Sequence, residues 1–284
     1  MAANLLKAGY HPVVFNRTRP KAEALREMGC RVAVNPAEVG AEADIVFTMV
    51  SDEAAVEQVI SGPDGIVGGM KQGGIVVEMS TVSPECERRL AGLLSERSIQ
   101  FLDAPVSGGD IGAREGTLAI MAGGDRDAFD KVYPLFQAMG KTITHCGPVG
   151  FGQLTKLCNQ ILVSVTLAAV CEAVAFARNT GLEPDVMLKA VSGGAAGSWQ
   201  LSNLGPKIAS RDYAPGFMVD LMQKDLRIVM ETSQKENFAA PATALVHQLF
   251  NALQGAGLGR SGTQALAVVW ESLGRLNVVS EETD

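Results

Sequence analysis

The sequence is poor in the residues that build metal sites and disulfides. It has three histidines and five cysteines in 284 residues, and no two cysteines are separated by two residues. The cysteines lie at positions 30, 86, 146, 158 and 171. An odd number of scattered cysteines is typical of reduced thiols, and His145-Cys146 is better explained as the end of a strand than as a ligand pair. We therefore expect a cytoplasmic protein without a metal site.

Excess positive charge is also absent. Lys and Arg number 24 against 31 Asp and Glu, which gives a net charge of −7. A negative chain is repelled by phosphate backbones and anionic lipids, so we exclude nucleic acid and membrane as the main partner. With 47% hydrophobic and 19% charged residues, the chain is long enough for one large folded domain or two ordinary ones.

Targeting segments are not visible in the sequence. The start, Met1-Ala-Ala-Asn4, lacks the basic stretch followed by an apolar one that marks a secretory signal. The most apolar stretch, 157–177, is interrupted by Asn159, Gln160, Ser164, Thr166 and Glu172. We therefore expect no transmembrane span.

Before residue 150 the pattern alternates between short apolar runs and helical segments. We predict strands at 12–15, 30–34, 44–50, 73–80, 101–105, 117–124 and 142–145, and helices at 1–9, 20–28, 36–43, 53–60, 84–98 and 127–139. This alternation is typical of a doubly wound α/β sheet, with continuous apolar runs as its buried strands.

After residue 150 only helices are predicted. No Gly or Pro interrupts the chain from 153 to 180, which indicates one long helix. Further helices are predicted at 184–191, 202–210, 219–235, 241–255 and 263–273, with a frayed end at 279–284. We place the domains at 1–149 and 150–284, with the long helix leading from the first into the second.

The long helix carries the most informative residues. Lys156 and Asn159 lie one turn apart near its start, and Glu172 is the only charged residue between Lys156 and Arg178. A helix that is apolar on both sides is expected to be buried. A lysine there is costly unless it is used, and loss of water lowers its pKa. The alternative is an ordinary lysine on a solvated helix face.

The ends of the predicted strands supply the other candidates, because doubly wound sheets bind ligands beyond the carboxyl ends of their strands. Arg17 occupies the place where an arginine accepts the extra phosphate of NADP and an acidic residue selects NAD. A solvated loop arginine is the alternative. The candidates at strand ends are Asn16, Arg17, Thr18, Met49, Val50 and Thr81.

A glycine-bearing loop follows the strand at 101–105. In Ser107-Gly108-Gly109, the adjacent glycines allow backbone N–H groups to close on an anion such as a substrate carboxylate.

Three motifs together resemble the β-hydroxyacid dehydrogenase family, which includes 3-hydroxyisobutyrate dehydrogenase and 2-hydroxy-3-oxopropionate reductase. They are Asp103-Ala-Pro-Val-Ser-Gly-Gly109, Gly147-x₂-Gly-x-Gly-x₃-Lys156-x₂-Asn159 and Lys224-Asp225-Leu226. The resemblance covers nearly the whole chain. It implies a Rossmann-type domain followed by an all-α domain built on the long interdomain helix, usually in an oligomer, so that we expect a homodimer or homotetramer.

The resemblance also implies an activity and roles for residues. It implies an NAD(P)-dependent oxidoreductase that interconverts a small β-hydroxyacid and its semialdehyde, with Lys156 as general acid/base beside Asn159. It implies that Ser107, Gly108, Gly109, Asn159 and Trp199 contact a small carboxylate substrate, that Thr81 lies at the nicotinamide end and that Lys224 lies near the cofactor. With the strand-end candidates Asn16, Arg17, Thr18, Met49 and Val50, Thr81 and Lys224 form the predicted cofactor site. Asn-Arg-Thr at 16–18 favours NADP, with NAD possible.

One feature of the family is missing from the sequence. The family opens with a strand and a G-x-G-x-x-G turn that holds the pyrophosphate, and this sequence begins at the helix that follows the turn. Two interpretations stay open. We favour a start that lies upstream; the alternative is a non-catalytic or cofactor-impaired relative that acts as a nucleotide- or protein-binding module.

Overall fold

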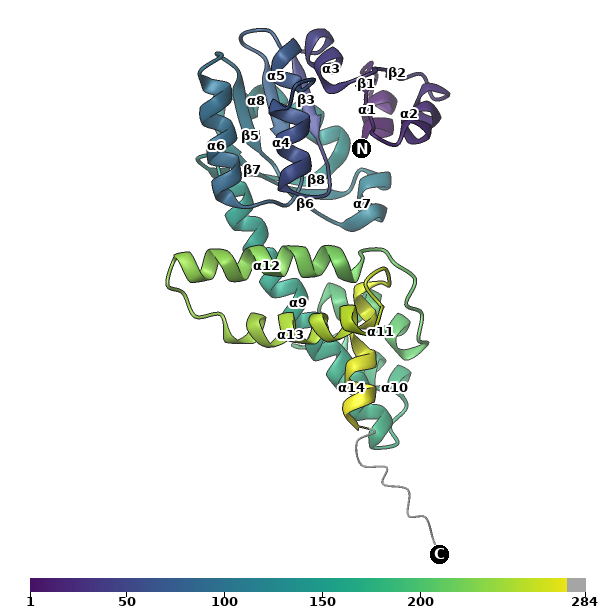
Figure 1. The fold of residues 1–284 in the computed structure, drawn as a ribbon. Helices are drawn as coiled ribbons and strands as arrows, with labels where there is room; N and C mark the ends of the chain where they lie inside the picture. Colours follow the sequence, from purple (N-terminus) through teal and green to yellow (C-terminus); the bar gives the residue numbers. More distant parts are fainter. Residues whose placement is uncertain (275–284) are drawn as a thin grey trace, which may run out of the picture. The chain divides into compact units, whose positions relative to one another are not determined.

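The computed structural model describes residues 1–274, and these divide into two compact units, with the division between Lys156 and Leu157 (Figure 1). The division falls within the long helix. Our prediction of a frayed end at 279–284 lies outside the described residues.

The first unit alternates strands and helices along almost its whole length, as predicted. Its elements are α1 (Ala2–Lys7), β1 (Val13–Val14), α2 (Arg19–Arg26), β2 (Arg31–Val32), α3 (Pro36–Glu42), β3 (Ile45–Thr48), α4 (Glu53–Ser61), α5 (Ile66–Gly69), β4 (Ile75–Glu78), α6 (Pro84–Ser95), β5 (Gln100–Asp103), β6 (Val106–Ser107), α7 (Gly109–Glu115), β7 (Leu118–Gly124), α8 (Arg126–Met139) and β8 (Gly140–Gly147).

The strands form one six-stranded and one two-stranded sheet. In the larger sheet the order is β3-β4-β5-β7-β6, with β8 beside β7. Strand β7 runs antiparallel to β5 and β6, so the sheet is mixed. Strands β1 and β2 pair with each other in a separate parallel sheet, and β1 does not pair with β3. In a dinucleotide fold the first strand lies between these two. The interruption agrees with the expectation that these 284 residues lack that strand.

Helices cover both faces of the larger sheet, which confirms the α/β prediction. Alternate side chains of β4 enter different cores, because successive residues of a strand point to opposite faces. Val76 packs in the core that includes residues of α3, α4, α5 and α6. Ile75 and Val77 pack in the core that includes residues of α1 and α8. A strand buried on both faces is read from the sequence as a continuous apolar run.

Two elements near residue 108 differ from the prediction. The loop that we predicted at 106–109 contains the short strand β6 and the first residue of α7, a helix that we did not predict. Gly108 and Gly109 have φ of +131° and +61°, values that let the chain reverse between the two elements. The sequence pattern around residues 109–115 is too polar and too short for helical periodicity to reveal α7.

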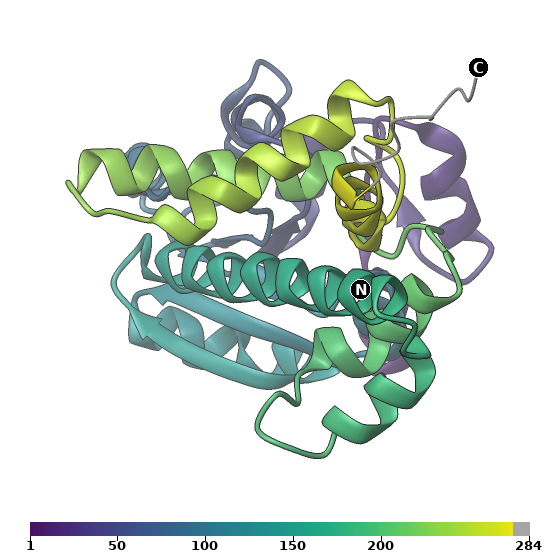
Figure 2. The ribbon, with the colours of Figure 1, turned by 90° about the horizontal axis from the view of Figure 1, so that it is seen from below.

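The second unit is helical throughout its described residues, as predicted. Its elements are α9 (Phe151–Asn179), which begins in the first unit, then α10 (Pro184–Val191), α11 (Trp199–Ala209), α12 (Val219–Lys235), α13 (Pro241–Gly255), the 3₁₀ helix η1 (Thr263–Leu266) and α14 (Ala267–Gly274). Helices α12 and α13 run side by side in two views (Figures 1 and 2). Helix α11 begins earlier than predicted because the Ser198 hydroxyl accepts a hydrogen bond from Leu201 N and caps it.

Helix α9 is not buried on both sides, and this part of our prediction is wrong. One side contributes Leu167, Cys171 and Val174 to the core of the second unit. The side chains of Leu162 and Phe176 are each 69% exposed. By length and composition alone, α9 is apolar enough to cross a membrane, and half of its most apolar window is buried inside the protein.

The first turn of α9 lies directly against the sheet of the first unit. A Cβ atom added at Gly152 would lie 2.4 Å from the Met121 carbonyl oxygen and 2.5 Å from that of Asp103. Both contacts are with backbone, which cannot rotate away. The helix can approach strands β5 and β7 this closely only because residue 152 has no side chain.

We expect Gly152→Ala to lower the free energy of unfolding by about 1–3 kcal/mol or more, because the added methyl group overpacks a rigid site. Gly92→Ala is the matched control. Gly92 lies in α6, and an added Cβ there would contact nothing within 4 Å. That change should raise stability by about 0.5–1 kcal/mol. Urea unfolding of the two variants measures both values, and equal effects would contradict the close approach.

Candidate functional site

Lys156 lies near the start of α9, where the structure brings two of the sequence motifs together. The residue is only 6% exposed. Its Nζ donates a hydrogen bond of 2.8 Å to the carbonyl oxygen of Val106. Val106 directly precedes Ser107-Gly108-Gly109. The ammonium group is therefore held beside the loop that we predicted to receive the substrate carboxylate.

The loop itself is fixed at one end and open at the other. Ser107 pairs with Ala119 across β6 and β7, and it is half-buried. Gly108 and Gly109 are exposed and precede the body of α7. A Cβ on Gly108 would approach Leu118 Cδ2 to 3.2 Å in a backbone conformation that other residues rarely adopt. The backbone of Gly108 and Gly109 is therefore accessible close to Val106, whose carbonyl oxygen accepts the hydrogen bond from Lys156.

The ends of β3 and β4 lie together at one edge of the sheet. Val50 N donates a hydrogen bond of 2.8 Å to the Ser80 hydroxyl oxygen. Met49 is 47% exposed, and Thr81 is half-buried directly after Ser80. The structure thus brings Met49, Val50 and Thr81 to one edge, as the parallel pairing of β3 and β4 requires.

The segment 16–18 forms a turn on the surface after β1. The Asn16 side-chain oxygen accepts a hydrogen bond of 2.8 Å from Thr18 N, which is an Asx turn. Arg17 is exposed between them. The side chain of Arg17 is therefore accessible at the carboxyl end of a strand, where a cofactor phosphate could reach it.

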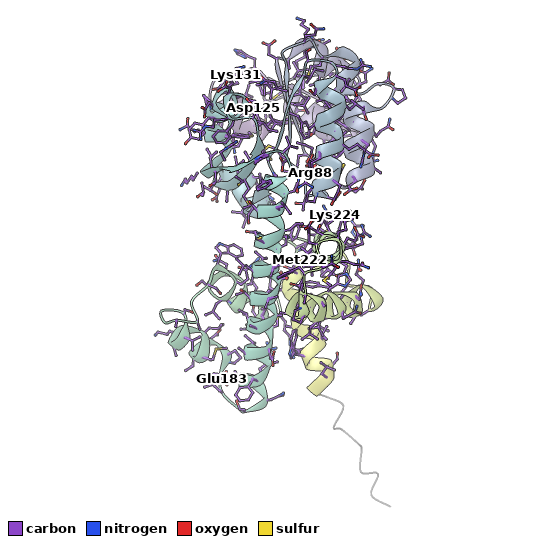
Figure 3. All side chains as sticks on the ribbon, turned by 90° about the vertical axis from the view of Figure 1, so that its left-hand side faces the viewer. Arg88, Asp125, Lys131, Glu183, Met222 and Lys224 are labelled. Atoms are coloured by element: carbon purple, nitrogen blue, oxygen red, sulfur yellow. The ribbon has the colours of Figure 1, made fainter. Side chains whose placement is uncertain are left out.

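In the second unit a chain of polar contacts links Asn159 with Lys224. Asn159 Nδ2 donates to Gln160 Oε1 at 2.8 Å, and Gln160 Nε2 donates to Asp225 Oδ2 at 2.7 Å. Lys224 Nζ forms an ion pair with Asp225 Oδ1 at 3.1 Å. Figure 3 labels Lys224 on α12. The linking residues Gln160 and Asp225 were not among our predicted site residues, although Asp225 stood in one of the quoted motifs.

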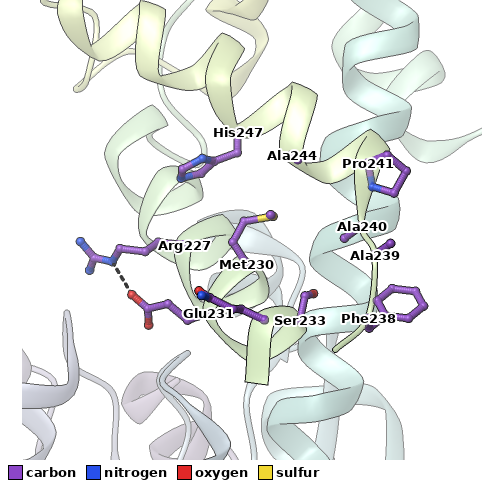
Figure 4. Close-up of a pocket in the computed structure, with 11 residues that line it drawn as sticks. Arg227, Met230, Glu231, Ser233, Phe238, Ala239, Ala240, Pro241, Ala244 and His247 are labelled. Carbon is purple, nitrogen blue, oxygen red and sulfur yellow. Dashed lines mark ion pairs between the residues drawn. The ribbon is translucent and has the colours of Figure 1, made fainter. Parts of the chain in front are cut away.

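Two predicted residues stand outside these networks. Trp199 is the first residue of α11 and is 61% exposed. Within residues 1–274, neither its side chain nor that of Arg17 hydrogen-bonds to another predicted site residue. The pocket between α12 and α13, lined by Arg227, Met230 and His247 among others, also contains no predicted site residue (Figure 4). The described residues place no three His, Cys, Asp or Glu side chains so that they could hold a metal ion.

Our sequence reasoning missed a buried acidic network beneath the edge of the sheet. Glu78, Glu87 and Asp103 have no exposed surface. Gln153 Nε2 donates to Glu87 Oε1 at 2.6 Å and to the Ser80 carbonyl oxygen at 2.9 Å. The available signal was an acidic residue at the end of an apolar strand, in Ile75-Val-Val-Glu78 and again in Gln100-Phe-Leu-Asp103.

Asp103 connects this network to the start of α9. Its Oδ1 accepts a hydrogen bond from Gly150 N at 2.7 Å, and its Oδ2 accepts one from Gln153 N at 2.8 Å. Burial raises the pKa of Asp103 to about 6, although these N–H donors act in the opposite direction. The carboxyl of a strand-end residue thus satisfies backbone donors at the beginning of the helix that carries Lys156.

Comparisons with known proteins match both parts of the chain. Residues 1–147 match the family described as the NAD binding domain of 6-phosphogluconate dehydrogenase. Residues 150–270 match the family described as NAD-binding of NADP-dependent 3-hydroxyisobutyrate dehydrogenase.

Individual relatives cover nearly the whole chain. A probable mitochondrial 3-hydroxyisobutyrate dehydrogenase-like protein of Arabidopsis thaliana is 40% identical over all of this chain and 85% of its own. The 2-hydroxy-3-oxopropionate reductase of Escherichia coli is 40% identical over 88% of this chain and 86% of its own. The crystal structure of 3-hydroxyisobutyrate dehydrogenase from Salmonella typhimurium has a TM-score of 0.85 and 30% identity, with 94% of each chain covered.

We expect Asp103→Ala to lower the free energy of unfolding by about 2–5 kcal/mol, because it leaves the buried N–H groups of Gly150 and Gln153, at the start of α9, without an acceptor. Asp125→Ala is the control. Asp125 caps α8 through a hydrogen bond from Ala128 N, at a more exposed helix start, and its loss should cost about 1 kcal/mol. Denaturant unfolding compares the two. If Asp103→Ala costs no more than Asp125→Ala, the buried cap does not have the importance assigned to it.

Proposed function

The chain belongs to the β-hydroxyacid dehydrogenase family, and from this premise we propose that it is an NAD(P)-dependent oxidoreductase that interconverts a small β-hydroxyacid and its semialdehyde. The observation that carries the proposal is the buried Lys156, whose Nζ lies 2.8 Å from the carbonyl oxygen of Val106 at the start of the Ser107-Gly108-Gly109 loop.

The substrates that we propose are of the 3-hydroxyisobutyrate or 2-hydroxy-3-oxopropionate type. The names of the two relatives above support this class. These compounds differ by one small substituent, and a pocket discriminates such groups by only about 1–3 kcal/mol. Comparison of kcat/KM across a panel of small hydroxyacids therefore decides which of these compounds is the substrate.

The described residues fit a nicotinamide cofactor at two points. Arg17 offers an accessible cation after β1, and Met49, Val50 and Thr81 lie together at the carboxyl edge of the sheet. A bound nicotinamide cofactor supplies or accepts the hydride. We propose NADP as the preferred cofactor, with NAD possible, because a guanidinium pairs well with a 2′-phosphate.

Lys156 would donate or accept the proton that accompanies hydride transfer. In the direction of reduction, the Lys156 ammonium polarises the carbonyl oxygen of the semialdehyde and gives it a proton. In the direction of oxidation, the neutral amine takes the proton from the substrate hydroxyl. The loop at 107–109 would hold the substrate carboxylate through backbone N–H groups, and Asn159, one turn beyond Lys156, would orient a substrate oxygen.

We expect Lys156→Ala to lower kcat by about 10²–10⁴-fold, because a general acid/base is lost, while the dissociation constant for the cofactor changes little. Lys156→Arg should retain the positive charge but fail in oxidation, since a guanidinium does not release its proton. Lys189→Ala, at an exposed lysine of α10, is the control and should match the wild type. More than a tenth of wild-type kcat in Lys156→Ala would remove Lys156 from the mechanism.

We expect kcat/KM to be higher with NADPH than with NADH, and Arg17→Asp to reverse or abolish that preference. Loss of a charged hydrogen-bond partner costs about 1.5–3 kcal/mol, or roughly ten- to a hundredfold in affinity. Arg19→Asp makes the same charge change two residues away, at an arginine paired with Glu23, and should leave the ratio nearly unchanged. Equal kcat/KM for both cofactors in the wild type would refute the role of Arg17.

Titration with NADPH and NADH, monitored by nicotinamide fluorescence, tests whether the chain binds a nicotinamide cofactor, which the proposed function requires. Binding without turnover of any hydroxyacid in the panel would favour the binding-only relative. Absence of binding would contradict the proposed cofactor.

A further inference from the structure

Strand β4 and helix α6 each carry a fully buried carboxyl group. Glu78 ends β4, Glu87 lies in α6, and both are 0% exposed. The two carboxyls lie close together, since each acts on the pKa of the other. Glu78 Oε1 accepts hydrogen bonds from Ser80 N and the Thr48 hydroxyl, and Glu87 Oε1 accepts one from the Gln153 amide. Oε2 of each residue is buried and, within the described part of the chain, receives no hydrogen bond from an N–H or O–H donor.

Two such carboxylates cannot both be ionised at low cost. Removing a carboxylate from water without a cation or donor is expensive, and like charges in a medium of low dielectric add repulsion. A single proton between them neutralises one group and supplies the donor that the Oε2 atoms lack.

The other titratable groups around the pair do not neutralise it. Asp103, on β5, adds a further negative charge beside Glu87. Cys86, next to Glu87 on α6, has Glu53 and Glu57 of α4 and Arg89 of α6 around it. Arg89 forms an ion pair with Glu57 and is exposed. Arg88, also exposed, lies against Gly150.

The pair is connected to Lys156 through one side chain. Gln153 donates to Glu87 and to the Ser80 carbonyl oxygen, while its own backbone N–H donates to Asp103. Gln153 and Lys156 are three residues apart on α9, so they are neighbours on the helix surface. The position of Gln153 therefore sets the position and rotation of the turn that carries Lys156.

We propose that Glu78 and Glu87 hold one proton between them, and that this singly protonated pair is a positioning element that fixes Gln153 and, through it, Lys156. The catalytic part of this statement rests on the proposed function of Lys156.

The pKa values agree with this geometry. Burial raises the pKa of Glu78 to about 7. Burial first, and then the charge of Glu78, raise the pKa of Glu87 well above its ordinary value. A carboxyl with a raised pKa in the folded state stabilises the protein fully below the unfolded value of about 4.5 and loses that contribution as the pH rises to about 7. The pair should therefore make the wild type less stable at pH 8 than at pH 5.

The test compares Glu87→Gln, Glu87→Leu and a control, Glu96→Gln. Glu96 is the exposed residue at the C-cap of α6. A glutamine at 87 can accept from Gln153 and donate to Glu78, so it replaces the protonated carboxyl without adding charge. The melting temperature of Glu87→Gln minus that of the wild type should be about 4–8 °C larger at pH 8 than at pH 5, because only the wild type loses the contribution of the pair. Glu96→Gln should follow the wild type.

The positioning role has its own readouts. Glu87→Leu removes the acceptor of Gln153 and should lower kcat at least tenfold with the KM for cofactor within threefold, whereas Glu87→Gln should restore kcat to within threefold of wild type. Glu87→Leu should also increase the rate at which an amine-reactive reagent labels Lys156, measured by peptide mass spectrometry. If Glu87→Leu does not fold, Gln153→Leu takes its place, because it breaks the same link.

The outcomes separate this inference from the proposed function. If the difference in melting temperature between Glu87→Gln and the wild type is the same at pH 5 and at pH 8, the shared proton is contradicted. Unchanged labelling of Lys156 in Glu87→Leu overturns the positioning role. Neither measurement needs turnover. If the protein oxidises no hydroxyacid in the panel, the proposed function is contradicted, but melting and labelling still test the shared proton and the positioning role.

Discussion

The capping of α9 by the Asp103 carboxylate is the interaction on which the rest of the candidate site depends. Asp103 ends β5, and its two oxygens accept backbone hydrogen bonds from Gly150 and Gln153. A helix start is rich in unsatisfied N–H groups, and here the acceptor comes from the sheet itself. Because Gly152 allows backbone contact, the cap holds the first turn of α9 against β5 and β7. Lys156, one turn later, is placed beside the loop at 106–109 as a consequence.

The same region concentrates buried polar groups that would destabilise an ordinary core. Glu78 and Asp103 end neighbouring strands, Glu87 lies in the first turn of α6, and all three are fully buried. Gln153 hydrogen-bonds to Glu87 and to Asp103. Most proteins avoid such clusters, since each unneutralised carboxylate costs free energy. A cluster that is retained next to a buried lysine is consistent with a site in which rigid placement matters more than local stability. In the second unit a similar chain of polar contacts connects Asn159 with Lys224.

Helix α9 takes part in both compact units. Its first turn belongs to the packing of the sheet, and its later turns place Leu167, Cys171 and Val174 in the helical core. The apolar character of its sequence serves burial on one side only, since Leu162 and Phe176 are largely exposed. Hydrophobicity alone therefore overestimated how much of this helix is covered.

The sequence by itself determined the order of the elements, the change from α/β to all-α near residue 150 and the family motifs. Continuous apolar strands, helical periodicity and turn glycines are local signals, and the bounds of α12 and α13 agree with the prediction at both ends. Tertiary structure alone decided that β7 runs antiparallel to β5, that one side of α9 is exposed, and that Glu78, Glu87 and Gln153 converge. These features depend on residues far apart in the chain. No local pattern encodes which distant side chain will satisfy a buried carboxyl, because that is fixed only when the strand ends and the helix start are packed together.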